Sequence, residues 1–231
     1  MKIPSEKDLL KAGVHFGHKP ASWHPKMADF IFGQKNGIHI IDLEQTKKQL
    51  ETATNFIKKT VADGKTILFV GTKIQAKDIV KKYAESCSMP YINDKWLGGT
   101  LTNFKVINSL VKKLEKLEHE AEDKETYAKK YTKREISEFK TEMKRLNKMV
   151  GGIREMKTLP GAIFIISARD EKTTILESTR KNIPTIAICD TNANPQKIDY
   201  PISGNDDALK SLDLITSVIA DAVKEGQKER V

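Results

Sequence analysis

The chain has 231 residues, a length that allows one domain carrying an insertion or two domains at most. Its 40 Lys and Arg exceed its 31 Asp and Glu, and the resulting formal charge of +9 favours a polyanionic partner, nucleic acid first. The sequence shows no membrane-length apolar run, no signal peptide and only two distant cysteines, so we expect a reduced, cytoplasmic protein without a disulfide scaffold.

The N-terminal region predicts a short helix followed by an irregular loop and a β-hairpin. Ser5 is a candidate N-cap with Asp8 three residues on, which predicts a helix over residues 7–12. Residues 14–20 are too rich in Gly, His and Pro for a regular element. Residues 29–32 and 38–42 are predicted strands, joined by a tight turn at Asn36-Gly37.

The rest of the chain alternates between buried strands and amphipathic helices. Strands are predicted over residues 66–70, 91–92, 161–166 and 185–189. Helices are predicted over residues 43–62, 76–84, around 175–176 and over 208–223. This alternation indicates an α/β fold with a parallel sheet and helices on both of its faces.

One segment breaks the alternation, because residues 100–150 contain neither Gly nor Pro. Apolar residues there follow heptad-like spacing in two runs: Leu110, Leu114, Leu117 and Ala121, then Ile136, Phe139, Met143, Leu146 and Val150. Thr132 and Glu135 form a capping box that starts the second run. We therefore predict an inserted antiparallel coiled-coil helical hairpin at residues 105–149, projecting from an α/β body of residues 1–104 and 150–231. A solvated hairpin without a partner is the alternative.

Two patterns point to ligands other than RNA, and neither is specific. Gly71-Thr72-Lys73 follows a strand, as a phosphate-binding turn does, but the glycine spacing of a dinucleotide or P-loop motif is missing, which favours an ordinary turn. Four histidines lie within residues 15–39, without a paired metal-binding motif or a nearby cysteine. We expect no metal site, no cofactor and no catalytic residues. If a divalent cation bound, Asp190 and Asp206 would be the carboxylates to test.

RNA contacts are predicted where cations accompany aromatic residues, Gly pairs or exposed helix faces. The Gly98-Gly99 pair lets a ribose-phosphate approach closely, or serves only as a hinge between domains. The candidate RNA-binding residues are His15, His18, Lys19, Trp23, His24, Lys26, Lys35, Asn36, Lys95, Trp96, Asn103, Lys112, Lys113, Lys129, Lys130, Lys133, Arg134 and Arg154.

Several segments together resemble one known family. They are GVHFGH (13–18), PKM (25–27), IFG (31–33), NGIHIIDLEQT (36–46), LFVGTK (68–73), WLGGTLTN (96–103), IAICDTN (186–192) and GNDDA (204–208). In this order they resemble the bacterial small-subunit ribosomal protein S-two family over nearly the whole chain. The chain departs from the family pattern at residues 167–172 and at Ser203.

The resemblance implies a flavodoxin-like body with a protruding coiled-coil hairpin. It also implies a structural, non-catalytic role in the small ribosomal subunit, with binding to ribosomal RNA. Its other partners would be neighbouring ribosomal proteins, including the large mRNA-binding protein S-one, and not a second copy of itself. Two alternatives are a nucleotide- or cofactor-binding α/β enzyme and a module that docks proteins only.

Overall fold

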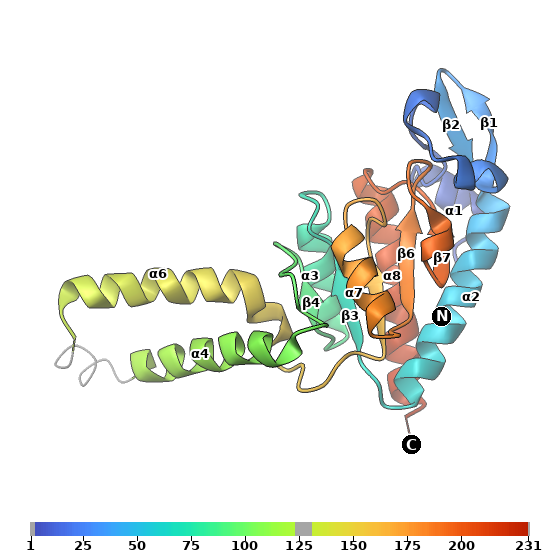
Figure 1. Ribbon diagram of the computed structural model, residues 1–231. Helices are drawn as coiled ribbons and strands as arrows, with labels where there is room; N and C mark the ends of the chain where they lie inside the picture. Colours follow the sequence, from blue (N-terminus) through green and yellow to red (C-terminus); the bar gives the residue numbers. More distant parts are fainter. Residues whose placement is uncertain (1–2, 123–130, 231) are drawn as a thin grey trace.

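The computed structural model describes residues 3–122 and 131–230, and its centre is a five-stranded parallel sheet (Figure 1). The strands are β3 (Ile67–Val70), β4 (Tyr91–Ile92), β5 (Ala162–Ile165), β6 (Thr185–Cys189) and β7 (Tyr200–Ser203). Their spatial order is β4-β3-β5-β6-β7, and every neighbouring pair is parallel. This is the order of flavodoxin-like sheets, in which the chain changes direction between β3 and β5. The predicted α/β class is confirmed.

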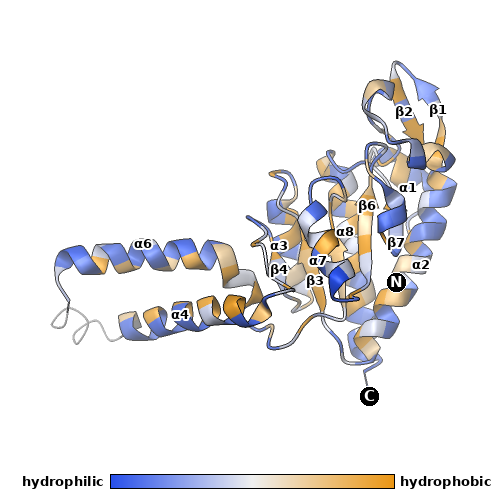
Figure 2. Ribbon diagram, in the orientation of Figure 1, coloured by the Kyte–Doolittle hydropathy of each residue, from blue (hydrophilic) through white to orange (hydrophobic). Residues whose placement is uncertain are grey.

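Helices cover both faces of the sheet because alternate strand residues point to opposite sides. One face packs Phe69 and Phe164 against α2 (Leu43–Ala62), α3 (Lys77–Ser86) and α8 (Leu209–Lys228). The other face packs Leu68 and Ile163 against α7 (Lys172–Arg180) and the base of two longer helices. Figure 2 shows the apolar strands between helices that are apolar on one side and polar on the other.

The sequence analysis does not predict the fifth strand, β7. It contains Pro201, which cannot donate a backbone hydrogen bond and therefore occurs in sheets mainly at edges. Gly204 N–H donates to Cys189 O at 3.1 Å, so Pro201 and Ser203 turn their backbone nitrogens away from β6. Ser203 N–H instead donates to the Oε1 atom of Gln49 on α2, at 2.7 Å.

The N-terminal region folds largely as predicted. Helix α1 (Glu6–Lys11) begins at a capping box formed by Ser5 and Asp8. Strands β1 (Ile31–Lys35) and β2 (Ile38–Ile41) form an antiparallel hairpin whose turn residues both have positive φ angles. The predicted start of the first strand at residue 29 is wrong. Residues Pro25–Phe30 form the 3₁₀ helix η2, which Pro25 starts and the His24 side chain caps. A second 3₁₀ helix, η1, spans Pro20–Ser22.

The insertion contains α4 (Phe104–Glu122) and α6 (Lys133–Val150), which lie side by side, run in opposite directions and extend away from the sheet (Figure 1). The predicted capping box of Thr132 and Glu135 is present at the start of α6. Leu114 of α4 and Leu146 of α6 are fully buried in the same hydrophobic cluster as Ile163 of the sheet. None of the described helices is long and apolar enough to cross a membrane. Short 3₁₀ turns η3 (Gly151–Ile153) and η4 (Pro195–Lys197) complete the chain.

Candidate functional site

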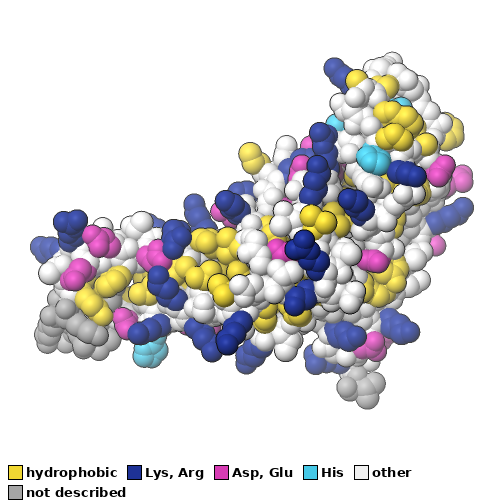
Figure 3. All heavy atoms as spheres, in the orientation of Figure 1, with side chains coloured by type: hydrophobic (Ala, Val, Ile, Leu, Met, Phe, Trp, Pro, Cys, Tyr) yellow, Lys and Arg dark blue, Asp and Glu magenta, His cyan; other side chains and the backbone are white. Residues whose placement is uncertain are grey.

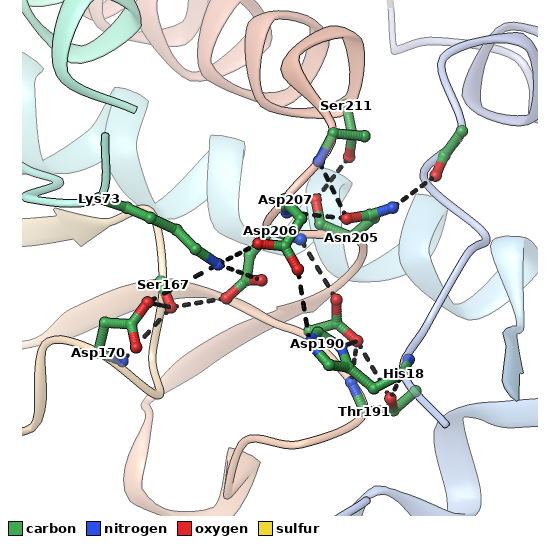
Figure 4. A network of polar contacts seen from close by, with 12 residues as sticks. His18, Lys73, Ser167, Asp170, Asp190, Thr191, Asn205, Asp206, Asp207 and Ser211 are labelled. Atoms are coloured by element: carbon green, nitrogen blue, oxygen red, sulfur yellow. Dashed lines mark hydrogen bonds and ion pairs between the residues drawn. The ribbon is translucent and has the colours of Figure 1, made fainter. Parts of the chain in front are cut away.

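A cluster of polar side chains lies where four strands of the sheet end (Figure 4). Lys73 follows β3, Ser167 and Asp170 follow β5, Asp190 and Thr191 follow β6, and residues 205–207 follow β7. The carboxyl edge of a parallel sheet is where ligand sites of α/β proteins normally form. We call these residues, together with His18, the carboxyl-edge cluster.

Lys73 is the cation at the centre of this cluster. Its Nζ atom lies 2.6 Å from Asp207, 2.9 Å from Asp206 and 3.7 Å from Asp170. Burial lowers the pKa of Lys73, but the bonds to Asp207 and Asp206 outweigh this effect and raise it above its ordinary value. Asp206 is 1% exposed and also accepts a hydrogen bond from Ser167 Oγ at 2.6 Å. Burial, and then the neighbouring charge of Asp190, raise the pKa of Asp206.

The N-terminal loop reaches the same edge through His18. The imidazole Nδ1 atom lies 3.0 Å from Asp190 Oδ1, and Nε2 lies 3.4 Å from Asp207 Oδ2. The bond to Asp190 raises the pKa of His18, although burial opposes this shift. His18 N–H donates to Thr191 Oγ1 at 2.8 Å, and His24 N–H donates to Thr191 O at 2.7 Å. The loop is therefore fixed to the sheet by its backbone as well as by a side chain.

The turn after β3 is built as an ordinary strand–helix turn, as the sequence favoured. The N–H of Thr72 donates to Glu171 Oε1 at 2.9 Å, and Lys73 is held by carboxylates. A Cβ atom at Gly71 would lie 2.8 Å from Val80 Cγ2, so close packing requires glycine here. The carboxylates around the turn would repel a phosphate group, which weighs against a nucleotide site.

A second buried carboxylate organises the loop before α4. Glu177 on α7 is 5% exposed, and its two oxygens accept five hydrogen bonds. The donors are the indole of Trp96, the backbone N–H groups of Gly99, Leu101 and Thr102, and the Thr102 hydroxyl. Burial by itself raises the pKa of Glu177, but these donors outweigh it, so the pKa lies below its ordinary value.

The lysines and arginines among the predicted RNA-binding residues divide into three groups. The exposed cations for which the described residues provide no ion-pair partner are Lys19, Lys26, Lys35, Lys95, Lys112 and Lys133. Three further cations are paired within the chain: Lys113 with Glu142 at 2.8 Å, Arg134 with Glu138 at 3.1 Å, and Arg154 with Glu118 at 2.7 Å. Lys129 and Lys130 lie outside the described residues.

The remaining candidates are aromatic or amide side chains. Asn36 and Asn103 are exposed, and Trp23 is 39% exposed with its ring 5.3 Å from that of His39. His15 is half-buried against Phe16, and His24 accepts a hydrogen bond from Lys26 N–H. Trp96 is 8% exposed and its N–H is already donated to Glu177, which weighs against stacking on a base.

Sequence reasoning missed the roles of Glu177, Lys73 and Asp207. A glutamate in a short helix gives no signal of burial, because such residues usually face solvent. The sequence predicts no metal site and gives Asp190 and Asp206 only as the carboxylates to test if a divalent cation bound; both lie in the carboxyl-edge cluster. Asp206, however, is held by Lys73 and Ser167, and Asp207 is the carboxylate that faces His18.

One comparison with known proteins bears on identity. A family model described as Ribosomal protein S2 matches residues 9–226. The match spans the N-terminal loop, the whole sheet, both helices of the insertion and nearly all of α8. The chain therefore belongs to the ribosomal protein S2 family, whose members are structural components of the small ribosomal subunit and not enzymes.

Proposed function

We propose that this protein binds ribosomal RNA within the small subunit of cytoplasmic ribosomes. The observation that carries the proposal is the set of exposed cations with no carboxylate partner among the described residues, on a chain of net charge +9. Figure 3 shows Lys and Arg side chains spread over the insertion and the body. Cations without intramolecular partners can neutralise phosphates without first breaking an ion pair.

The first RNA-binding surface is the N-terminal loop with its hairpin. Lys19, Lys26 and Lys35 are exposed there, and Asn36 sits at the tip of the turn. Trp23 keeps part of its ring accessible and can stack on a base or ribose. His18 and Thr191 fix the N-terminal loop to the sheet. The backbone that carries the RNA-binding side chains of the loop therefore has a defined position.

The second RNA-binding surface is the pair of helices α4 and α6, which we propose is an antiparallel coiled coil. Residues 105–149 would form this projecting hairpin, and residues 1–104 and 150–231 would form the body. The two parts share one buried apolar cluster, which includes Leu114, Leu146 and Ile163. Lys112 and Lys133 face solvent without intramolecular ion pairs in the described structure, and we expect them to contribute more than Lys113 or Arg134.

Docking of neighbouring ribosomal proteins, including the large mRNA-binding protein S-one, is the remaining part of the proposal. It is supported by an apolar groove between the N-terminal loop and the β1–β2 hairpin. Phe32 at this groove is 81% exposed, and Leu10 and Phe16 are also exposed. Exposed apolar patches of this kind often mark protein interfaces.

The test measures binding to small-subunit RNA as a function of salt. A variant with Lys19, Lys26 and Lys35 changed to Ala should bind more weakly, and its log–log salt slope should fall by roughly 0.7–0.9 for each phosphate that is no longer neutralised. The matched control changes Lys48, Lys181 and Lys210, which are exposed elsewhere, and so removes the same charge. Equal weakening in both variants would contradict a specific N-terminal surface. A flat salt response of the unmodified protein would contradict RNA binding and favour a protein-docking role.

A further inference from the structure

An open groove lies at the amino-terminal edge of the sheet, away from the carboxyl-edge cluster. Its volume is about 1010 Å³, and its walls are α2, the loops that lead into β3, β5 and β6, and the start of β7. Figure 1 shows the end of α2 that borders it, beside the C-terminus, at the far end of the body from the β1–β2 hairpin. We call it the amino-edge groove, and its lining includes Phe56, Lys59, Lys65, Leu159, Asn182 and Tyr200. It shares no lining residue with the two RNA-binding surfaces proposed above.

The groove carries positive charge that is not neutralised within the described part of the chain. Lys59 and Lys65 line it, and both are exposed there without an ion-pair partner among the described residues. Arg230 adds a cation at the rim, because its guanidinium lies 3.4 Å from the position that a Cβ atom of Gly64 would take. Asp63 is the only carboxylate among the described lining residues. This excess of cations attracts a polyanion.

Lys65 is held at the groove by close packing rather than by a carboxylate. A Cβ atom at Gly161 would lie 2.5 Å from Lys65 Cβ and 2.9 Å from Lys65 Cδ, so the stem of the lysine rests on the glycine backbone. The N–H of Gly161 donates to Thr66 O at 2.8 Å, which fixes the two loops to each other. A cation whose stem is already ordered loses less conformational entropy when it binds a ligand.

Two aromatic rings also line the groove. Phe56 of α2 and Tyr200 of β7 are stacked, with centroids 4.2 Å apart and planes inclined by 18°, and both are half-buried. Leu159 adds an exposed apolar side chain, and Asn55 and Asn182 add exposed amides that can hydrogen-bond to base edges. A base stacks on a protein ring only when its own face is free, as in a single strand and not within a duplex. The aromatic pair therefore favours unpaired nucleotides.

We propose that the amino-edge groove binds a single-stranded segment of RNA. Lys59, Lys65 and Arg230 neutralise its phosphates, and a base stacks on the pair of rings. Unpaired nucleotides supply both the phosphates and the free base faces that this combination of side chains requires. A double helix would reach the cations but not the rings, and an acidic protein segment would not require stacked rings. The proposal rests on the RNA-binding function proposed above and adds a contact at which the RNA is unpaired.

The experiment measures, by fluorescence anisotropy, the binding of a short, fluorescein-labelled single-stranded RNA of mixed sequence. The same RNA annealed to its complement is the comparison. The protein is the full-length chain with Lys19, Lys26 and Lys35 changed to Ala, so that the N-terminal surface contributes little; this loop variant is the parent of the variants below. We expect the parent to bind the single strand at least about fivefold more tightly than the duplex.

Two pairs of lysine substitutions test where the single strand binds. Lys59→Ala with Lys65→Ala should weaken its binding to the parent by about tenfold. The matched control is Lys48→Ala with Lys210→Ala, which removes the same charge from exposed positions outside the groove. The control pair should change the affinity by less than about twofold, because charge there lies away from the bound RNA.

Substitutions of Tyr200 test the stacking contact. Tyr200→Leu removes one ring of the aromatic pair and should weaken single-strand binding by about fivefold or more, with duplex binding unchanged. Tyr200→Phe keeps the ring and should bind as the parent does. Circular dichroism melting shows whether each variant is folded. If Tyr200→Leu does not fold, the lysine pairs decide the question, since they change only exposed side chains.

Three outcomes would overturn the proposal: equal affinity of the parent for single strand and duplex, equal weakening by the two lysine pairs, or no effect of the groove pair. Groove variants that bind RNA normally but are lost from assembled subunits would show that a protein occupies the groove instead. If the unmodified protein binds small-subunit RNA but the parent does not bind the single strand, the groove proposal fails while the RNA-binding function stands.

Discussion

The carboxylate of Glu177 accepts the indole N–H of Trp96 at 3.0 Å and so links α7 to the loop that leads into α4. The same carboxylate accepts three backbone N–H groups and a hydroxyl from that loop. No lysine or arginine pairs with it in the described structure, so hydrogen bonds alone compensate a buried charge. This one side chain therefore helps to fix the loop before α4 against α7.

Replacing Glu177 by Gln should therefore destabilise the protein strongly. Gln keeps one acceptor oxygen, but its NH₂ group would face N–H donors that are then left without an acceptor. We expect the free energy of unfolding to fall by about 3 kcal/mol, measured by urea denaturation. Glu51→Gln, on the exposed side of α2, is the matched control and should change stability little. Equal urea midpoints for the two variants would contradict this role of Glu177.

The hydrogen bonds to Glu177 also predict how the stability of the protein changes in acid. Because the folded protein lowers the pKa of Glu177 below its ordinary value of 4.5, the ionised form adds stability above that pH. This contribution is lost as the pH falls through the lowered folded value. The stability difference between the unmodified protein and Glu177→Gln should shrink progressively below about pH 4.5. A difference that stays constant with pH would show that ionisation of Glu177 adds no stability.

Gly17 should tolerate no larger residue, because it packs against the sheet where the N-terminal loop docks. A Cβ atom there would lie 2.5 Å from Thr191 Cγ2 and 2.9 Å from Thr191 Oγ1, and Thr191 is fully buried. Gly17→Ala should cost about 2 kcal/mol of unfolding free energy. The control is Gly33→Ala, since nothing lies within 4 Å of a Cβ atom at Gly33. A neutral Gly17→Ala substitution would mean that the loop is not packed as described.

His18 should make docking of the N-terminal loop sensitive to a rise in pH. Asp190 first, and then Asp206 and Asp207, raise its pKa against the effect of burial. A raised folded pKa adds stability that is complete below the unfolded value and is lost as pH rises through the folded value. The difference in melting temperature between the unmodified protein and His18→Gln should therefore shrink as the pH rises above the ordinary histidine value of 6.5. His24→Gln is the control, and a difference that grows with pH would contradict the pairing.

Shortening the insertion should separate its outer part from its base. Residues 119–141 contain six basic and six acidic residues, so replacing them with a short Gly/Ser linker keeps the net charge. We expect an unchanged melting transition and weaker RNA binding. Removing all of residues 105–149 should instead lower the transition, because Leu114 and Leu146 leave the core. Unchanged RNA affinity in the shorter variant would indicate a solvated hairpin without a partner.

Local signals in the sequence predicted much of the fold. The continuous apolar runs that became β3, β5 and β6 are typical of parallel strands buried on both faces. Capping boxes and the Asn36-Gly37 turn were equally predictable, because each depends on residues a few positions apart. Strand β7 was not, since its four residues include a proline and carry little apolar pattern.

The carboxyl-edge cluster could be predicted only in part. The sequence placed Asp190 at the end of a strand and drew attention to His18, but it gave no reason to bring them together with Asp207. That meeting depends on the strand order and on the path of a loop with no regular structure. The burial of Glu177 could not be predicted for a similar reason, because its hydrogen-bond partners lie 75 to 81 residues away in the sequence.

The outer side of β7 bears on how this chain avoids self-association. A free sheet edge recruits strands from other molecules through its unpaired backbone N–H groups. Pro201 has no N–H, and the N–H of Ser203 is already bonded to Gln49. The opposite edge strand, β4, has only two residues. The parallel sheet of newly synthesised copies waiting to be incorporated into ribosomes therefore presents almost no template for intermolecular β-aggregation.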